Sequence, residues 1–228
     1  MQNQKPKIVI YGGNGFVGTH IAEHLSAHDL CIVCLSRTGH KPIHLNDSDW
    51  SKSVRWCKGD ASDPDLELLA EAHTVIVLVG SAPIPTFSKQ AFEKQFFNNG
   101  IAPAKAIEAS KEAGVTRIIL MGAHIPFFLN TDRFAYAKGK NMALESAKDF
   151  AAHSQQHGAV VMQPGAIYGK RHLKNGKVIP LDLAMSPASK IVPTQFIDVD
   201  RIAQRVTSIV LNPDEYDGSF TLLKNNEI

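Results

Sequence analysis

Residues 7–18 read KIVIYGGNGFVG, and the fold that we predict is built outward from this stretch. The apolar run Ile8–Ile10 consists of β-branched residues, which favours a short strand buried on both faces. Gly12, Gly15 and Gly18 follow the run at intervals of three. Because glycine permits a tight turn and a close approach of the backbone, we expect a turn directly after the strand.

Residues Phe16–Leu25, after the turn, predict a helix. The first N–H groups of a helix have no partner within it, and its dipole is positive at that end, so an anion binds there favourably. A glycine triplet alone is a weak signal, but a strand before it and a helix after it predict a site for the phosphates of a dinucleotide. The residues that we expect to contact the dinucleotide here are Gly12, Asn14, Gly15, Phe16, Val17 and Gly18.

Length and composition limit the class of protein. A chain of 228 residues suits one domain, or one domain with a small appendage. The net charge of +2 predicts no nucleic-acid partner. No apolar run approaches the length of a membrane span, and the start MQNQKPK is too short and polar for a signal peptide. We therefore expect a cytoplasmic protein without a membrane span.

The three cysteines are an odd number, which argues against a disulfide framework. Cys31 and Cys34 form a C-x-x-C pattern, which is also found in redox and metal sites. They lie in the strand-like run CIVCL, and residues three apart on a strand point to opposite faces. We therefore expect buried core cysteines rather than a functional pair.

The predicted first helix contains the pattern H-x-x-E-H at His20, Glu23 and His24, which is a zinc-peptidase signature. His28 extends the stripe by one more helical step. The alternative is a solvated helix face, with the histidines outward and the apolar residues of the neighbouring side on the sheet. Because this helix already begins at the predicted phosphate site, we favour the solvated face and predict no metal.

The second predicted strand, Leu30–Leu35, is followed by Ser36, Arg37 and Lys41. In proteins that bind NAD, an Asp or Glu at this position binds the ribose 2′-hydroxyl, and such a carboxylate would repel a 2′-phosphate. A hydroxyl and a guanidinium would bind that phosphate. We therefore predict NADP(H) as the preferred cofactor over NAD(H). The alternative is that Arg37 is an ordinary loop cation.

Further apolar runs predict strands, and predicted helices alternate with them. These runs are Val54–Lys58, Thr74–Val79, Thr116–Met121, Ala159–Met162 and Ser219–Leu223. The alternation predicts an α/β fold, a Rossmann-type doubly wound parallel sheet with helices on both faces. Ligands of such sheets bind outside the carboxyl ends of the strands. The stretch FIDVDRIA resembles a V-x-V-x-D-V-A turn in which the aspartate caps a helix. The resemblance implies that Asp200 is the N-cap of the predicted last major helix, which runs to about Leu211.

Tyr136 and Lys140 form a Y-x-x-x-K pattern in the stretch FAYAKGKNMALE. Residues four apart share one helix face, so the phenol and the ammonium can act together. A nearby ammonium lowers the pKa of a tyrosine toward neutrality. The phenol can then give a proton to a carbonyl oxygen, or take one from an alcohol in the reverse direction.

This pattern, after the glycine turn and five strand units, resembles the short-chain dehydrogenase/reductase superfamily. The form GGNGFVG is most similar to its extended and atypical branch, which is epimerase/dehydratase-like and includes a complex I accessory subunit and a fungal coenzyme Q biosynthesis subunit. The resemblance implies an oxidoreductase for a small carbonyl or alcohol. It also implies a Rossmann domain over residues 1–163 and a small C-terminal substrate lobe over residues 164–228, packed on it. A homodimer is a possible assembly.

The resemblance also assigns roles at the cofactor. It places Asp60 and Ala61 beside the adenine, although Asp60 also suits a turn or cap before a helix that begins at Asp63-Pro64. The stretch QPGAIYG resembles the family's R-P-G-x-x-Y-G near the nicotinamide, with Gln163 in place of Arg. The cofactor contacts implied in these turns are Asp60, Ala61, Val79, Gly80, Ser81, Pro164, Gly165 and Ile167, with Tyr136 and Lys140 at the nicotinamide ribose.

Within the predicted helical stretch Gln90–Ala113, Asn99 stands where the family has an asparagine that supports the active-site lysine through water. The alternative is an ordinary polar helix residue. The region 171–195 is expected to wall the substrate pocket. The basic residues in and next to this region could attract an anionic substrate, but we favour a solvated loop. These residues are Lys170, Arg171, Lys174 and Lys177.

One part of the family's catalytic set is missing. The family has a serine at the end of the fifth strand, but this chain has Gly122, Ala123 and His124 there. His124 can donate a hydrogen bond in its place or face the solvent, and Thr131 is a weaker substitute. Loss of one such donor costs on the order of 2–4 kcal/mol in other enzymes. A second function therefore stays open, a non-catalytic dinucleotide-binding sensor or assembly factor for a redox, quinone-related pathway.

Overall fold

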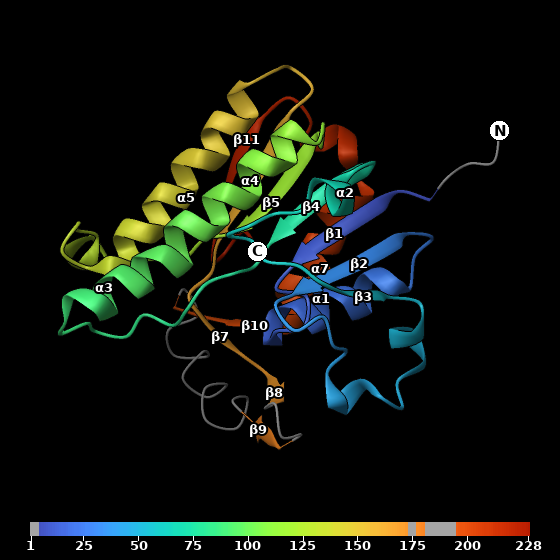
Figure 1. Ribbon diagram of the computed structural model, residues 1–228, viewed down its shortest axis with the longest axis horizontal. Coiled ribbons are helices and arrows are strands. Elements are labelled where there is room, and N and C mark those ends of the chain that lie inside the picture. Colours follow the sequence, from blue (N-terminus) through green and yellow to red (C-terminus); the bar gives the residue numbers. More distant parts are fainter. Residues whose placement is uncertain (1–4, 173–176, 181–194) are drawn as a thin grey trace.

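The computed structural model describes residues 5–172, 177–180 and 195–228. Its centre is a seven-stranded sheet in the order β11-β6-β5-β4-β1-β2-β3 (Figure 1). Every pairing in this sheet is parallel, which confirms the predicted doubly wound α/β fold. The strands are β1 (Lys7–Tyr11), β2 (Cys31–Ser36), β3 (Arg55–Lys58), β4 (Ala72–Val77), β5 (Arg117–Met121), β6 (Gly158–Gln163) and β11 (Phe220–Lys224).

Helices cover both faces of the sheet. The helices are α1 (Phe16–Ser26), α2 (Leu66–Leu69), α3 (Lys89–Phe96), α4 (Ala102–Glu112), α5 (Ala135–Ala152) and α7 (Val199–Leu211). The alternation of side chains along β1 separates the two layers. Ile8 and Ile10 belong to one buried cluster with α1 and α7, whereas Val9 and Tyr11 belong to the other with α4 and α5. The central strands are therefore buried on both faces, as a parallel sheet requires.

The long helical stretch predicted at Gln90–Ala113 is interrupted by a π-helical segment, Phe97–Ile101. The segment crosses α5 closely at two glycines. A Cβ on Gly100 would lie 2.9 Å from the Cα of Gly139, and a Cβ on Gly139 would lie 2.9 Å from the Cβ of Asn99. Both glycines therefore let α5 approach the segment that carries Asn99.

The elements after β6 divide between two places. In the sheet, β11 pairs with β6, and α7 packs against α1, so both join the central layers. Beyond the sheet lie β7 (Ala166–Tyr168) with β10 (Phe196–Asp198), and β8 (Lys170–His172) with β9 (Val178–Pro180) (Figure 1). We assign a substrate lobe to these short strands as a proposal. Lys174 and most of the expected substrate wall lie outside the described residues.

Two helix starts differ from the sequence-based prediction. The helix expected at Asp63-Pro64 begins at Leu66, and Asp65 caps it by accepting a hydrogen bond from the Glu67 N–H at 2.9 Å. In α7 the N-cap is Asp198, which accepts from the Asp200 N–H at 2.8 Å. In both cases the capping residue is the last one with extended backbone, because an N-cap precedes the helical dihedral angles.

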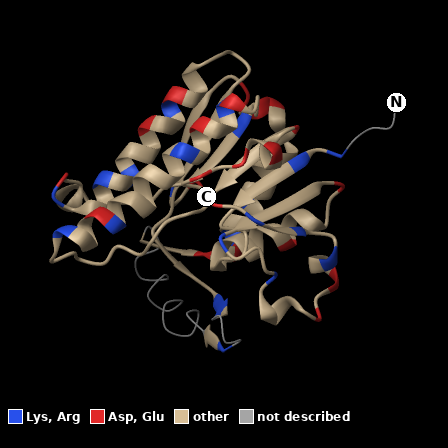
Figure 2. Ribbon diagram, viewed as in Figure 1, with Lys and Arg blue, Asp and Glu red and all other residues tan. Residues whose placement is uncertain are grey.

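All three cysteines are free thiols. Cys34 is buried as predicted, but Cys31 is exposed, because it is the first residue of β2 and lies at the rim of the sheet. Lys and Arg residues are interspersed with Asp and Glu over the helices that Figure 2 shows. No helix in the described part of the chain is long and apolar enough to span a membrane.

Candidate functional site

A cavity of about 440 Å³ lies at the carboxyl ends of β1 to β4. It is the location that the topology of an open α/β sheet favours for a ligand. The cavity brings together predicted cofactor-binding residues from four separate segments of the sequence. These residues are Gly12, Asn14, Gly15, Ser36, Arg37, Asp60, Ala61, Val79, Gly80 and Ser81.

The glycine turn approaches its neighbours very closely. Gly12 has a φ of +84°, which favours glycine. A Cβ on Gly13 would lie 2.6 Å from the Cβ of Cys34, and one on Gly18 would lie 2.4 Å from the Gly12 oxygen. Gly15 is the N-cap of α1, and no side chain caps this helix. The turn thus leaves the first N–H groups of α1 available to an anion, as a dinucleotide site requires.

Polar side chains gather where β2 ends. Asn14 donates to the Thr38 hydroxyl at 3.5 Å, and the Ser36 hydroxyl accepts from the Gly39 N–H at 3.1 Å. Arg37 is exposed and lines the cavity. Lys41 does not line it; its ammonium donates to the Ser51 hydroxyl at 3.4 Å, and it belongs to a neighbouring cavity of about 460 Å³.

Asp60 has the turn role that its sequence position suggested, and its place beside an adenine stays a prediction. Its carboxylate accepts hydrogen bonds from the Ser62 N–H at 2.9 Å and the Ser62 hydroxyl at 2.8 Å, so it closes the turn after β3. These hydrogen bonds, with a smaller effect from Arg37, hold the pKa of Asp60 below its usual range. Asp60 also lines the main cavity, with Ala61 next to it.

Asn99 clamps the turn that follows β4. Its Oδ1 accepts from the Ser81 N–H at 3.1 Å, and its Nδ2 donates to the Ser81 hydroxyl at 2.8 Å and to the Gln95 oxygen at 2.9 Å. A Cβ on Gly80 would lie 2.8 Å from Asn99 Oδ1 and 3.5 Å from Lys140 Nζ. Asn99 is therefore a buried residue that fixes the turn beside the lysine, and its support of the lysine through water stays a prediction.

Tyr136 and Lys140 lie on α5 as predicted, with Lys140 Nζ 5.9 Å from the centroid of the Tyr136 ring. Lys140 donates to the Met121 oxygen at 2.7 Å, at the end of β5. Burial lowers the pKa of Lys140 to about 8 and raises the pKa of Tyr136 to about 12. The prediction of a lowered tyrosine pKa is thus wrong for this arrangement, because the ammonium is directed to a carbonyl and burial decides the phenol.

His124 and Lys140 line a second, smaller cavity of about 140 Å³ beside Gly122, Ala123 and Gln163. The backbone N–H of His124 donates to the backbone oxygen of Pro164 at 2.8 Å. Its ring is in an exposed residue and makes no hydrogen bond within the described part of the chain. No hydrogen bond joins this ring to Tyr136 among the described residues.

The remaining predicted residues lie near the site without lining the main cavity. Phe16, Val17 and Gly18 form the first turn of α1. The Gly165 N–H donates to Asn225 Oδ1 at 2.7 Å, and Ile167 pairs with Ile197 between β7 and β10. Gly165 and Ile167 follow the end of β6, where the chain leaves the sheet.

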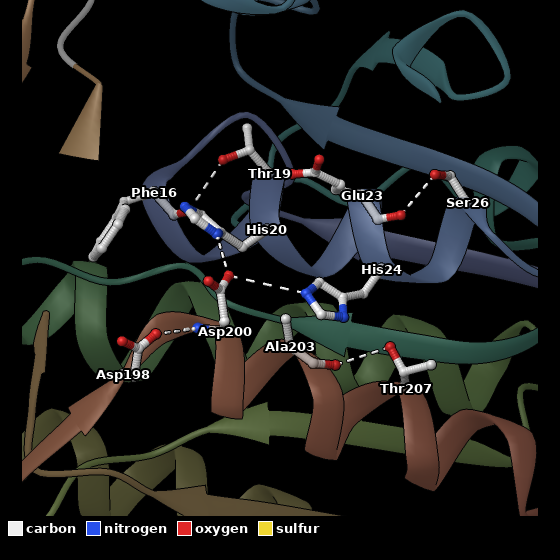
Figure 3. Close-up of polar contacts among 10 residues, drawn as sticks. All are labelled: Phe16, Thr19, His20, Glu23, His24, Ser26, Asp198, Asp200, Ala203 and Thr207. Atoms are coloured by element: carbon white, nitrogen blue, oxygen red, sulfur yellow. Dashed lines mark hydrogen bonds and ion pairs between the residues drawn. The ribbon is translucent and has the colours of Figure 1, made fainter. Parts of the chain in front are cut away.

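The histidines of the H-x-x-E-H pattern face α7 rather than solvent (Figure 3). His20 Nδ1 lies 2.7 Å from Asp200 Oδ1, and His24 Nε2 lies 3.9 Å from the same oxygen. Glu23 points away from this group (Figure 3). Through these contacts with Asp200 the two histidines join α1 to α7. Among the described residues no group of three or more His, Cys, Asp or Glu could hold a metal ion.

Several cavity residues were missed in the sequence. They are Tyr11, Leu35, Gly59, Ser62, Leu78, Phe97, Asn98 and Ala102. Half of them lie at or next to a strand end, where their residue types carry no strong chemical signal: Tyr11, Leu35, Gly59 and Leu78. Gly13 was also missed, although it does not line the cavity. Its close packing on Cys34 could have been predicted, because a Gly-Gly pair at a strand end indicates close backbone packing.

The fold and this cavity define a Rossmann-type dinucleotide-binding protein. The model of the NAD dependent epimerase/dehydratase family matches residues 8–192, and the chain belongs to this family. An uncharacterized chloroplastic protein of Arabidopsis thaliana is 32% identical over 190 residues, which are 81% of this chain and 58% of that protein. Human sterol-4-alpha-carboxylate 3-dehydrogenase, decarboxylating, is 27% identical over 132 residues, 58% of this chain and 32% of that enzyme.

The chain thus spans 58% and 32% of the lengths of these two relatives. Solved structures share the fold at lower identity. The UDP-Glc/GlcNAc 4-epimerase of Campylobacter jejuni has a TM-score of 0.70 at 17% identity, over 97% of this chain and 81% of that one. A short-chain dehydrogenase/reductase of Serratia marcescens has a TM-score of 0.68 at 14% identity, over 96% of each chain.

Proposed function

We propose that this chain is an NADP(H)-dependent oxidoreductase of a small carbonyl or alcohol. The observation that carries the cofactor assignment is the end of β2, where Ser36 and Arg37 line the main cavity and no carboxylate follows the strand. A guanidinium there can bind a 2′-phosphate, whereas NAD-binding sites have an acidic residue at this position. The close packing of Gly13 and Gly18 supports the fit of a dinucleotide, because larger residues would displace the turn.

When bound, the nicotinamide supplies a hydride to the carbonyl carbon. Tyr136 gives its proton to the carbonyl oxygen, so that an alcohol leaves and the phenol regains a proton from solvent. Because burial raises the pKa of Tyr136 to about 12, the phenol is protonated at neutral pH. The protonated phenol is the form that can donate a proton to a carbonyl oxygen.

Lys140 and Asn99 have positioning roles in this proposal. Lys140 is tied to the Met121 oxygen at the end of β5, and Asn99 fixes the Gly80–Ser81 turn. Together they hold the wall between the cofactor cavity and the tyrosine. We propose the cytoplasm as the location; the plant relative is described as chloroplastic.

A specific observation favours a second function, dinucleotide binding without turnover. Gly122 and Ala123 follow β5 and offer no hydroxyl, and the His124 ring makes no hydrogen bond to Tyr136 among the described residues. A carbonyl oxygen would then have one hydrogen-bond donor fewer, at a cost on the order of 2–4 kcal/mol. A sensor or assembly factor of a redox pathway needs only the cofactor site.

The first experiment is a calorimetric titration of NADPH and NADH into protein freed of bound nucleotide. Tight NADPH binding with weak NADH binding supports the cofactor assignment, and equal affinities contradict it. A panel of small carbonyl compounds is then assayed by NADPH consumption. Consumption above the blank supports the oxidoreductase, whereas binding without consumption over the panel favours the sensor.

A further inference from the structure

Tyr11 is the last residue of β1 and directly precedes the glycine turn. Its side chain is 1% exposed. Within the described part of the chain, its hydroxyl is buried and has no hydrogen-bond partner. Buried hydroxyl groups in folded proteins nearly always have a partner, so an unpaired hydroxyl beside a cavity can pair with a group that enters the cavity.

The residue also lines the main cavity. In the sheet it lies opposite Leu35 on β2 and Val77 on β4, and it shares a buried cluster with Ala61 and Ala102. These neighbours place it between the ends of β2 and β4. The charges of Asp60 and Asp65, which follow β3, act on its hydroxyl, so the hydroxyl lies within reach of the turn after β3. Arg37, which we have assigned to the phosphate on the adenosine ribose, follows the end of β2.

The electrostatic surroundings keep the hydroxyl a donor. Burial, and then the charges of Asp65 and Asp60, raise the pKa of Tyr11 above its ordinary value. The phenol therefore keeps its proton over the whole neutral range and can donate it in a hydrogen bond. The adenosine half of a dinucleotide offers ring nitrogens and ribose oxygens as acceptors.

We propose that the Tyr11 hydroxyl is a binding determinant for the adenosine half of the dinucleotide, to which it donates a hydrogen bond. This proposal rests on the proposed dinucleotide function. It differs from the role of Arg37, because an adenosine contact acts on NADPH and NADH alike. It also explains why a hydroxyl is tolerated in the apolar layer below the turn.

The test is Tyr11→Phe in the full chain, with dissociation constants for NADPH, NADH and ADP-ribose measured by calorimetry. A neutral hydrogen bond corresponds to about a 2- to 13-fold change in affinity. We expect all three ligands to weaken by this factor, with the NADPH-to-NADH ratio unchanged. The matched control is Tyr216→Phe, since Tyr216 is also buried but does not line the cavity.

A melting curve separates binding from folding. Removal of an orphan hydroxyl does not lower the melting temperature of the free protein, whereas a structural role for Tyr11 would lower it. Wild-type affinities in Tyr11→Phe, in a protein that binds NADPH, overturn this inference and leave the proposed function intact. Failure of the wild type to bind any of the three ligands overturns the proposed function itself.

Discussion

His20 on α1 and Asp200 on α7 form a hydrogen-bonded pair, with Nδ1 2.7 Å from Oδ1, although 180 residues separate them. The pair joins the helix that begins at the glycine turn to the helix that follows β10. Asp200 also lies in the first turn of α7, where a negative charge is favourable. This contact thus holds together two helices that are far apart in the sequence.

The pair predicts a measurable coupling between the two helices. His20→Ala and Asp200→Ala should each lower the free energy of unfolding by about 1 kcal/mol, and the double variant should lose less than their sum by about 0.5–1 kcal/mol. Urea unfolding at pH 7 measures all three. Glu23→Ala on the same helix should be near neutral, because its side chain points away (Figure 3). Strict additivity of the two substitutions would refute the coupling.

Arg37→Ala should weaken NADPH binding by about 10- to 100-fold, because a charge-assisted hydrogen bond to a phosphate is lost. NADH lacks that phosphate, so its affinity should change by less than about 3-fold. Calorimetric titration of both cofactors measures the ratio. Arg55→Ala is the matched control, since Arg55 is an exposed arginine that does not line the cavity. Equal losses of affinity for both cofactors would contradict the assignment of Arg37 to the 2′-phosphate.

Tyr136→Phe should reduce NADPH-dependent turnover by about 10²- to 10⁴-fold, the usual contribution of a positioned general acid. The affinity for NADPH should stay within about 2-fold, because the ring and its packing beside Phe134 are kept. Steady-state kinetics and calorimetry on the same preparation separate the two effects. Turnover equal to that of the wild type would exclude Tyr136 as the proton donor.

Gly13→Ala should destabilise the protein by about 1–3 kcal/mol, because its Cβ would lie 2.6 Å from the Cβ of Cys34. Gly15→Ala is the comparison, since its Cβ would be 3.1 Å from the Gly12 oxygen at an exposed position. It should cost less than about 1 kcal/mol. Thermal unfolding measures both, and equal costs would mean that the packing on Cys34 is not the constraint.

Lys140 predicts a pH dependence of stability in the cofactor-free protein. Its pKa is lowered from 10.5 to about 8, so the folded state binds the proton less tightly than the unfolded state. Below pH 8 both states are protonated and the cost of the buried charge is complete. Between pH 8 and 10.5 the unfolded state holds more protons, and stability rises with pH through this group.

Lys140→Met removes the contribution of the Lys140 ammonium to the pH dependence of stability, with little change in side-chain volume. The free energy of unfolding of the wild type should gain about 2–3 kcal/mol over the variant between pH 8 and 10.5. Denaturant unfolding at pH 7.5, 9 and 10 gives the difference at each pH, and other titrating groups cancel in it. Parallel pH curves for the two proteins would show that the ammonium is not buried in solution.

The sequence alone determined the fold class and the glycine turn. The β-branched run of β1, the three spaced glycines and α1 are contiguous, so local propensity and backbone freedom were enough to predict them. The alternation of apolar runs with helical segments then predicted the parallel sheet. The position of Ser36 and Arg37 at the cavity was predictable for the same reason, since both residues come at the end of a recognisable strand.

Only the tertiary structure decided the contacts between distant segments. The orphan hydroxyl of Tyr11, the clamp of Asn99 on Ser81 and the pair of His20 with Asp200 each depend on which elements become neighbours. The pKa of Tyr136 depends on burial, which sums over many residues that are remote in sequence. Packing and desolvation are properties of the assembled chain, whereas turn geometry is a property of a few consecutive residues.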